Sequence, residues 1–585
     1  MKYKLKENSI DLTSPTFLEE YFTNCGIGKL SSFLDKPDMM DEENAVHLAN
    51  INEGVEMLMK HLEKGSSIFL QVDSDTDGYT SAAIIYSFLK EIKPDVNIYW
   101  SIHQAKEHGI IPDQVDWEYE LVIIPDAGSN QLEETEELAQ RADVLIIDHH
   151  IADIDINSDK VVVINNQTSP NFKNKNLSGA GMVYKFIQYY CEYNFLGNIY
   201  EKYVDLAAIG IVADSMDSRQ LDNNYLIQKG LNNIYNKMIK ALLERQAFSV
   251  SSTTNPTKID IAFYIAPIIN GLIRFGTMEE KENFFRALIH NDIDETYERI
   301  YRGQTKYETY YEKVARESAN IKGAQDRTIN KLVPLLQDRI ESEGLQNNAI
   351  IIYTSPKTNP DEIPSTLTGL IAMKLVNHYK KPALVLRPVF IGKDVFYRGS
   401  GRGIAADGFD SLKSYLSSTG LVEYASGHDF AHGTGIPEAN IPKLIERANK
   451  DLGNIDFGSR VIEVDAVFEM TQSFEYIFSK FAHLTHLYGN NIPEPLFVVK
   501  MFVTENNFMV MGQNRSSFKI NIGGVSFIKF RAAEDIEIIE DMFMQGPIGL
   551  EVLGRVSLNE YNGHTSVQMI INDYNFIDTK EMVLF

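Results

Sequence analysis

The sequence has little cysteine and no long hydrophobic run. Its 585 residues include only two cysteines, Cys25 and Cys191, which excludes a disulfide framework and a cysteine-based zinc site and is typical of a reducing compartment. No apolar stretch reaches the roughly 18 residues that a membrane span requires. The first residues, MKYKLKENSIDL, contain no apolar signal-peptide core. We therefore expect a cytoplasmic protein without membrane association.

Basic residues are also few in comparison with acidic residues. The chain has 55 Lys and Arg residues against 81 Asp and Glu, which gives a formal net charge of −26. This balance argues against a protein that holds nucleic acid by bulk electrostatic attraction. It does not exclude a nuclease, because divalent metal ions convert an acidic pocket into a phosphate site.

The length predicts several domains, since 585 residues exceed what one hydrophobic core supports. We expect a helical segment, an α/β domain, a helical connector with a solvated face, a second α/β domain and a small β-barrel. The expected segments are 1–60, 61–300, 301–345, 346–455 and 456–585. Asn-Gly, Gly-Gly and Pro between short β-rich runs indicate the barrel at the end of the chain.

Five short β-rich runs alternate with helical patterns in the first α/β domain. They read IFLQV, NIYWSI, LVIIP, DVLIID and KVVVIN. This alternation predicts a parallel sheet, and ligands of such sheets collect beyond the carboxyl ends of the strands. Three of the runs end directly in polar residues, which we therefore expect to meet at one edge of the sheet.

Four acidic motifs contain candidate metal ligands. They read D-S-D-T-D-G at 73–78, P-D-A-G at 125–128, D-H-H at 148–150 and A-D at 213–214. In an extended chain the carboxylates of Asp75 and Asp77 would face the same way, and Gly78 would allow a tight turn into a helix. The candidate ligands are Asp73, Asp75, Asp77, Asp126, Asp148, His149, His150 and Asp214. Mixed carboxylate and imidazole ligands suit Mn²⁺ or a similar metal better than Ca²⁺.

Each motif has an ordinary structural explanation when it is taken alone. A strand followed by Asp and Gly, as at Asp73, is often only a turn. Asp126 or Asp214 could be the N-cap of a helix, and His149 and His150 could be one core and one surface histidine. Four such coincidences would be needed in one chain, so we favour a metal site that hydrolyses phosphate esters.

The four motifs resemble those of the DHH phosphoesterases, and nearly the whole chain is similar to RecJ-type single-strand-specific exonucleases. The stretches that carry this similarity are FYIAPIINGLIRFG (263–276), YRGSGRGIAADGFD (397–410), ASGHDFAHG (425–433), GNNIPEPLF (489–497) and LNEYNGHTSVQMIINDY (558–574). The resemblance implies an α/β fold with a parallel-sheet DHH catalytic domain, a long helical connector, a second α/β DHH-associated domain and a C-terminal OB-like β-barrel.

The resemblance also implies how the ligands are shared. Two ions, Mn²⁺ or Mg²⁺, would be bridged by Asp126. Asp75 would complete the first site, and the other ligands of the second site would be Asp77, His149 and Asp214. Asp148 would orient the histidines, and His150 would lie behind the ligands or face the phosphate. Many relatives have a histidine at the position of Gln71, so the first site would be weaker here or would be completed by Asp73.

The DHH-associated domain would bind the end of the DNA. Ser400 and Arg402 match residues that recognise a terminal 5′-phosphate, and His428 matches a histidine near the scissile phosphate. The expected substrate-binding residues are His103, Arg274, Ser400, Arg402, Gly427 and His428. His103 and Ile268 stand where relatives have arginine, and Ser426 stands where they have glycine. His103 would be charged only at lower pH.

The expected activity is a Mn²⁺- or Mg²⁺-dependent 5′→3′ exonuclease that degrades single-stranded DNA to 5′-mononucleotides in recombination or repair. Two ions would activate water and neutralise charge on the phosphoryl group, with no covalent enzyme intermediate. The expected partner is single-stranded DNA, with a helicase or single-strand-binding protein as a candidate, and the expected state is a monomer. Candidate stacking residues are Phe497, Phe502, Phe508 and Phe518, although alternation in a small barrel predicts that most are core.

Two alternatives stay open at this point. A DHH hydrolase of short oligoribonucleotides or signalling nucleotides would not need the barrel, so deletion of 460–585 would spare it. A non-enzymatic DNA-binding module could keep the fold after losing its metals. The intact carboxylates argue against that second alternative.

Overall fold

The computed structural model describes residues 2–28, 30–34, 42–104, 107–458, 461–469, 474–512, 514–561 and 564–578. The chain separates into two compact units. The first unit contains Met1–Ile273, Thr277–Ser318 and Ile462–Phe585, and the second contains Arg274–Gly276 and Ala319–Val461. Within the described ranges, no helix is both long and apolar enough to cross a bilayer.

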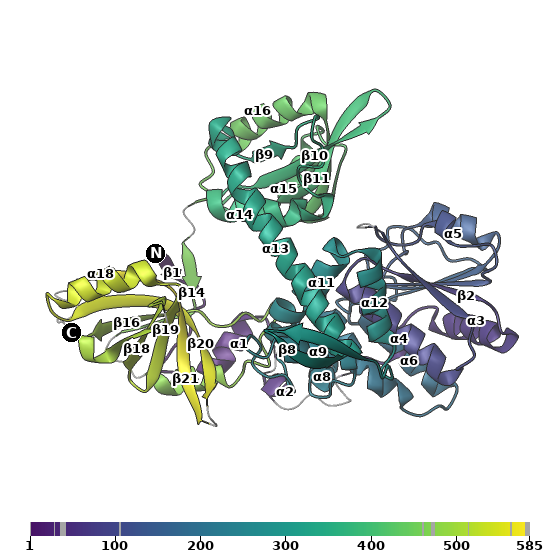
Figure 1. The fold of residues 1–585 in the computed structure, drawn as a ribbon, viewed down its shortest axis with the longest axis horizontal. Helices are drawn as coiled ribbons and strands as arrows, with labels where there is room; N and C mark the ends of the chain where they lie inside the picture. Colours follow the sequence, from purple (N-terminus) through teal and green to yellow (C-terminus); the bar gives the residue numbers. More distant parts are fainter. Residues whose placement is uncertain are drawn as a thin grey trace. The chain divides into compact units, whose positions relative to one another are not determined.

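A five-stranded parallel sheet, which includes the strand labelled β2 in Figure 1, lies at the centre of the predicted catalytic domain. Its strand order is β3-β2-β4-β5-β6. The strands are β2 (Ile68–Val72), β3 (Ile98–Ile102), β4 (Leu121–Pro125), β5 (Asp143–Asp148) and β6 (Val161–Asn165). All neighbouring pairs are parallel. The prediction of a parallel sheet from the five β-rich runs is therefore confirmed.

Helices cover both faces of this sheet. The helix α5 (Leu132–Ala139) places Leu138 in a core with Val144 and Ile146. The helix α3 (Ile51–Lys64) brings Gly54 against Leu145, on the opposite face because side chains alternate along a strand. Two-sided burial explains why β4, β5 and β6 contain continuous runs of Val, Ile and Leu rather than alternating polar and apolar residues.

The helix α4 (Thr76–Ile92) connects β2 to β3. A mainly helical region follows the sheet, and its longer helices are α6 (Gly179–Tyr193), α7 (Val204–Ala213), α8 (Leu221–Leu231), α9 (Lys237–Arg245), α11 (Ala266–Phe275) and α12 (Met278–Ile289). An antiparallel hairpin, β7 (Thr296–Tyr301) and β8 (Gln304–Thr309), then precedes the long helix α13 (Tyr310–Ser342). The predicted helical connector is wrong for the residues before Tyr310, because β-branched and aromatic residues flank a two-residue turn there.

The second unit contains a mixed sheet with the order β12-β13-β11-β10-β9. Its strands are β9 (Ile351–Thr354), β10 (Ala383–Ile391), β11 (Asp394–Arg402), β12 (Tyr424–His428) and β13 (Ala431–Pro437). The accompanying helices are α14 (Thr368–Tyr379), α15 (Leu412–Ser418) and α16 (Ile441–Leu452). Only β9 and β10 pair in parallel, and the other neighbours are antiparallel. This is the predicted second α/β segment.

The C-terminal domain is built on a seven-stranded sheet with the order β15-β16-β20-β21-β19-β18-β17. Its strands are β15 (Ala466–Phe468), β16 (Phe497–Val503), β17 (Phe508–Met511), β18 (Ser517–Ile522), β19 (Val525–Phe530), β20 (Ile548–Tyr561) and β21 (His564–Ile577), accompanied by α17 (Glu475–Ala482) and α18 (Ala533–Phe543). Phe497 and Phe518 are fully buried, and Phe508 packs against the same core, as the core interpretation predicts. Phe502 is half-buried.

The N-terminal residues belong to two different cores. The strand β1 (Tyr3–Leu5) pairs with β14 (Ile462–Val464), and the helix α1 (Phe17–Asn24) places Tyr21 and Phe22 in the core of the C-terminal domain. In contrast, α3 covers the parallel sheet. Residues 1–60 are therefore not one helical segment, because the apolar face of α1 completes a core built mostly by the end of the chain. The other predicted domain boundaries stay predictions.

Candidate active site

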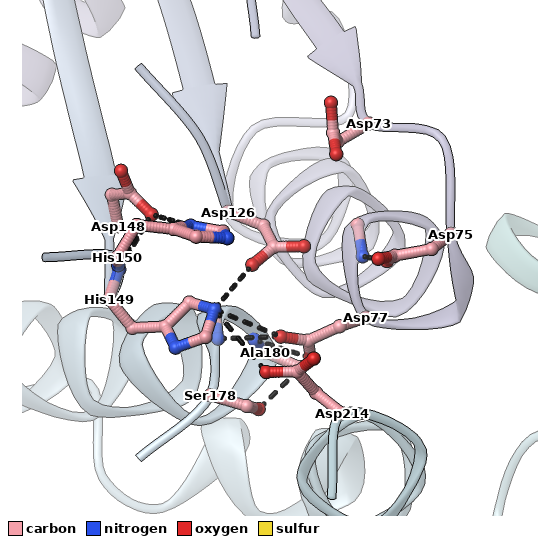
Figure 2. A network of polar contacts seen from close by, with 12 residues as sticks. Asp73, Asp75, Asp77, Asp126, Asp148, His149, His150, Ser178, Ala180 and Asp214 are labelled. Atoms are coloured by element: carbon pink, nitrogen blue, oxygen red, sulfur yellow. Dashed lines mark hydrogen bonds and ion pairs between the residues drawn. The ribbon is translucent and has the colours of Figure 1, made fainter. Parts of the chain in front are cut away.

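The predicted ligands gather at the carboxyl edge of the parallel sheet (Figure 2). Asp73 follows β2, Asp126 follows β4, and Asp148 is the last residue of β5. Asp214 reaches the same place from the C-terminal end of α7. Parallel strands end at one edge, and this topology brings together residues that are far apart in the sequence.

The conformation predicted for Asp75 and Asp77 is wrong. The two residues are not in an extended segment, because Asp75 is the N-cap of α4 and Asp77 lies in the first turn of that helix. The Gly78 N–H donates to Asp75 Oδ1 at 3.0 Å, as expected for an N-cap aspartate. Gly78 is needed for close approach rather than for a turn, since a Cβ there would lie 2.6 Å from Asp73 Cβ.

The N-terminus of α6 holds the carboxylate of Asp77. Ser178 Oγ donates to Asp77 Oδ1 at 2.9 Å, and the backbone N–H groups of Gly179 and Ala180 donate to Asp77 at 2.7 and 3.1 Å. A helix N-terminus stabilises an anion through its unpaired N–H groups and its dipole. Sequence reasoning missed these residues, although the L-S-G-A-G stretch at 177–181 has the pattern of a helix start.

Asp126 lies at the centre of the site. Figure 2 shows its side chain among the labelled carboxylates and histidines. Its φ of 64° is in the left-handed region, which is strained for a residue other than glycine. Asp126 is 2% exposed, and its Oδ1 accepts no hydrogen bond from the described residues. His149 Nε2 lies 3.1 Å from that oxygen.

Three groups of candidate ligands share members. Each group has ligand atoms that all lie within 4.8 Å of one another. The groups are Asp126, Asp148, His149 and His150; Asp77, His149 and Asp214; and Asp73, Asp75 and Asp126. Asp126 belongs to two of them, and His149 Nε2 also lies 3.5 Å from Asp214 and 3.9 Å from Asp77. The side chains predicted as metal ligands are therefore near neighbours in the structure.

Crowding of negative charge raises the pKa of several carboxyl groups. Burial and then the nearby charges of Asp77 and Asp75 raise the pKa of Asp126 well above its ordinary value. The same causes raise the pKa of Asp214 to about 8. The pKa of Asp75 is raised by burial and by Asp73 and Asp77. A bound cation would remove this repulsion between carboxylates.

Asp148 contacts both histidines, which differ in protonation state. Its Oδ1 accepts from the backbone N–H of His149 at 2.7 Å and lies 2.8 Å from His150 Nδ1. The hydrogen bond with Asp148 raises the pKa of His150 to about 9, so His150 is a cation. Burial lowers the pKa of His149, which leaves its imidazole neutral and able to bind a metal. Burial opposes the charge on Asp148, but the hydrogen bond and charge of His150 lower its pKa.

Asp73 is contacted by His108 and Gly109, which sequence reasoning did not select. His108 Nδ1 lies 2.7 Å from Asp73 Oδ2, and the Gly109 N–H donates to Asp73 Oδ1 at 2.9 Å. Both oxygens of Asp73 therefore already have neighbours. Its role as a metal ligand stays a prediction.

Two other residues near the site have structural partners. His103 is buried, with Nε2 lying 2.9 Å from the carbonyl oxygen of Gly109, and burial lowers its pKa, so it is neutral. Its predicted contact with substrate stays a prediction. Asn270 Oδ1 accepts from Thr76 N and Oγ1 at 3.2 and 3.0 Å, which anchors the start of α4. Asn270 is the asparagine of the Ala-Pro-x-x-Asn stretch, a signal that could have identified it.

Arg402 and Ser400 lie together in the second unit. Ser400 Oγ is 2.9 Å from Thr368 Oγ1, and Arg402 Nη1 donates to the Gly401 carbonyl at 2.8 Å. Burial and the positive charge of Arg274 lower the pKa of Arg402. Gly369 makes room for this pair, since a Cβ there would lie 2.6 Å from Arg402 Nη2. Neighbouring guanidinium groups favour an anion.

His428 and Gly427 lie at the end of β12. Both residues are exposed, and Gly427 has a φ of 125°, which favours glycine. His432, which sequence reasoning missed, is 3% exposed on the neighbouring strand, and a Cβ on Gly401 would lie 2.5 Å from its Nε2. Burial and Arg402 lower the pKa of His432 to about 4, so it is neutral. The binding roles of Arg274, Ser400, Arg402, Gly427 and His428 stay predictions.

The residues at the sheet edge fit a divalent cation. Asp126 Oδ1 is a buried acceptor without a hydrogen bond, and the surrounding carboxyl groups have raised pKa values. Glycines form the wall next to the carboxylates, since a Cβ at Gly179 or Gly210 would lie 2.3 Å from Asp126 Oδ1 or 2.2 Å from Asp77 Oδ1. Carboxylate oxygens with a neutral imidazole suit Mn²⁺ or Mg²⁺.

Binding of Mn²⁺ is expected to release protons at pH 7. With a pKa of about 8, the carboxyl group of Asp214 is mostly protonated at pH 7 in the metal-free protein, and a cation must displace that proton. The apparent affinity should therefore rise as the pH increases towards 8. Titration calorimetry in two buffers of different ionisation enthalpy measures the protons released. The Asp214→Asn variant should release fewer protons, and an unchanged number would contradict this explanation.

Comparison with known proteins identifies two of the domains. The model of the DHH family, N-terminal domain, matches residues 67–211, and the model of the RecJ OB domain matches residues 464–573. The first match spans the parallel sheet and most of the ligands. The second match spans most of the seven-stranded sheet.

Relatives and solved structures cover almost the whole chain. A protein from the SPbeta prophage of Bacillus subtilis (strain 168), provisionally named single-strand DNA-specific exonuclease YorK, is 33% identical over 553 residues, which are 93% of this chain and 94% of that protein. The single-stranded-DNA-specific exonuclease RecJ of Thermus thermophilus is 23% identical over 92% of this chain and 72% of its own length. The crystal structure of RecJ from that organism with Mn²⁺ gives a TM-score of 0.65 at 21% identity, over 91% of this chain and 72% of that chain. The crystal structure of the same RecJ with Mg²⁺ gives a TM-score of 0.65 at 19% identity, over 99% of this chain and 79% of that chain. The chain belongs to the RecJ-type single-strand-DNA-specific exonucleases of the DHH family.

Proposed function

We propose that the protein is a divalent-metal-dependent exonuclease that degrades single-stranded DNA from the 5′ end to 5′-mononucleotides. The names of its relatives support the substrate, and the Mn²⁺ and Mg²⁺ in the Thermus thermophilus RecJ structures support the metals. We further propose that it works in DNA recombination or repair, as a monomer, with a helicase or single-strand-binding protein as a candidate partner.

The observation that carries the proposal is the environment of Asp126. Asp126 belongs to two of the groups of candidate ligands, and its Oδ1 is a buried carboxylate oxygen without a hydrogen bond. Such an oxygen is costly to bury unless a cation is present. In our proposal Asp126 would be a ligand shared by two ions. Asp75, with Asp73, would help to hold one ion, and the other would be held by Asp77, His149 and Asp214. Ions bound there would activate water and offset charge on the transferring phosphoryl group.

The chain's own groups would orient the substrate around that site. His150 is positively charged and 59% exposed at its side chain, so it is suited to contact a phosphate oxygen. The N-terminus of α6 holds the carboxylate of Asp77 in place through three hydrogen bonds. Asp148 holds the backbone N–H of His149 and the ring of His150 beside the proposed ligands.

The 5′→3′ direction of digestion would come from recognition of the 5′ end of the DNA. Ser400 and Arg402, with Arg274 close to Arg402, form a cationic group suited to a terminal phosphate. His428 and Gly427 would lie next to the DNA. His103 is also proposed to contribute to substrate binding, and its side chain is buried. An end held by its phosphate presents the first phosphodiester for cleavage.

The test is digestion of single-stranded oligonucleotides labelled at either end, with and without a 5′-phosphate, in Mn²⁺. Mononucleotides released from the 5′ end support the proposal. Cleavage from the 3′ end would contradict the proposed polarity. Turnover of dinucleotides without digestion of DNA would favour the hydrolase of short oligoribonucleotides or signalling nucleotides.

The Arg402→Gln variant is expected to lose preference for a 5′-phosphate. Loss of a charge-assisted contact of this kind costs about 10-fold to 100-fold in apparent affinity. The ratio of kcat/KM for phosphorylated and unphosphorylated substrates should therefore fall towards one. Arg387→Gln, which removes a guanidinium paired with Asp361 in the same unit, is the control. An unchanged ratio in Arg402→Gln would exclude Arg402 from recognition of the phosphate.

A further inference from the structure

The hairpin of β7 and β8 is an exposed feature that neither the metal site nor the OB domain uses. Its turn is Arg302-Gly303, and both residues have positive φ, 52° and 76°. This is the geometry of a two-residue hairpin turn, and it places Arg302 at the tip. Ile300 and Tyr307 are 76% and 71% exposed, so the hairpin packs little of its surface against the rest of the first unit.

One face of the hairpin combines aromatic rings with positive charge. Cross-strand partners share a face, and the register pairs Arg299 with Lys306 and Tyr301 with Gln304. The cationic groups of Arg299, Arg302 and Lys306 lie 5.0, 5.3 and 5.4 Å from the ring of Tyr301, which is 40% exposed. Lys313, at the start of α13, lies 4.0 Å from the ring of Tyr297 on the same face.

The positive charge at the tip is not neutralised by neighbouring carboxylates. Glu308 is on this face, but it pairs with Arg316 at 2.5 Å and with Arg299 at 3.9 Å. Arg302 and Lys306 have no ion pair within the part of the chain that the structure describes. In a chain of net charge −26, such a cluster is a local exception.

We propose that this face of the hairpin binds single-stranded DNA outside the metal site, with a base stacked on Tyr301 and phosphates beside Arg302 and Lys306. The inference rests on the proposed function, because the strand would be the substrate itself. Proteins that bind single strands combine aromatic platforms with cations in this way. A duplex fits poorly, since its bases are already stacked and do not expose a face to a tyrosine.

The first test measures binding without cleavage. Full-length protein with Asp126→Asn is titrated into a fluorescent oligothymidylate of 20 nucleotides, and anisotropy gives the affinity. Tyr301→Ala should weaken binding about fivefold or more, as expected for loss of one stacked base. Tyr301→Phe should restore it, because the ring is kept. Tyr307→Ala is the matched control, since Tyr307 is the same residue type on the opposite face of the hairpin.

The second test measures the electrostatic contribution. Arg302→Gln and Lys306→Gln should each reduce the slope of log affinity against log salt by about 0.7, the value for one phosphate contact on a single strand. Thermal unfolding should be unchanged, because these side chains are exposed and form no ion pairs with described residues.

The outcomes separate the inference from the proposed function. Equal affinity and equal salt slope in the Tyr301, Arg302 and Lys306 variants would overturn the inference while the parent still binds DNA. Hairpin variants that bind DNA normally but lose association with a second protein would instead assign this face to a protein partner. A parent protein that binds no single-stranded DNA would contradict the proposed function.

Discussion

Replacing Asp126 by asparagine is expected to lower the release of mononucleotides from single-stranded DNA by about 1000-fold or more. The substitution removes the one charge shared by two groups of ligand atoms, and divalent ions contribute several kcal/mol to such reactions. Asparagine is the best replacement for the backbone, because it tolerates the left-handed φ of 64°. The measurement is Mn²⁺-dependent digestion of a 5′-labelled oligonucleotide.

A stability measurement separates loss of function from loss of fold. In the metal-free protein, Asp126→Asn removes one of several crowded carboxyl groups, so its unfolding temperature should stay the same or rise at pH 8. Addition of Mn²⁺ should then raise the unfolding temperature of the parent more than that of the variant. Asp113→Asn, at an exposed position, is the control for both measurements. Activity within tenfold of the parent in Asp126→Asn would exclude the proposed bridging role.

Adding a single methyl group at Gly179 is expected to lower activity by about 100-fold without unfolding the protein. The Cβ of Gly179→Ala would lie 2.3 Å from Asp126 Oδ1 and 2.5 Å from Asp126 Cβ, so Asp126 must move. Displacement of a catalytic group by about 1 Å can cost that much. Gly179 is the first residue of α6, where alanine is otherwise a better helix residue than glycine.

Two other glycines provide matched controls for this effect. Gly28→Ala places its Cβ in open space and should change neither activity nor stability. Gly54→Ala places its Cβ 2.6 Å from the side chain of Ile164, away from the ligands, and should lower stability while Mn²⁺ affinity is kept. If Gly179→Ala loses stability but keeps its affinity for Mn²⁺, then the glycine is needed for packing rather than for the metal site.

The sequence predicted the parallel sheet and the identity of the clustered carboxylates because both depend on local patterns. A buried parallel strand reads as a short run of Val, Ile and Leu, and a polar residue directly after it lies at the carboxyl edge. Three such motifs, with a fourth at the end of a helical run, indicated a shared metal site, and the structure brings Asp126, His149 and Asp214 together.

The residues that hold those carboxylates could not be found in this way. Ser178 and Gly179 contact Asp77 across about 100 residues of sequence, with a separation of 101 for the hydrogen bond from Ser178 Oγ. His108 reaches Asp73 from a loop whose conformation no periodic pattern fixes. Contacts of this type depend on how helices pack on the sheet, which is a property of the whole core.

Two predictions from the sequence were wrong because contacts formed by folding outweigh local sequence patterns. The extended conformation predicted for Asp75 and Asp77 failed because capping of α4 outweighs the local alternation of side chains. The single helical segment predicted for residues 1–60 failed because Tyr21 and Phe22 find their apolar partners near the other end of the chain.

The sequence alone determined which chemical groups are present, which strands carry them and which family the motifs resemble, because short-range patterns record secondary structure and residue type. Only the tertiary structure decided the left-handed backbone at Asp126, the different protonation states of His149 and His150, and the exposure of Tyr301. These properties arise from burial and from charges brought close by folding, and neither is encoded by spacing along the chain.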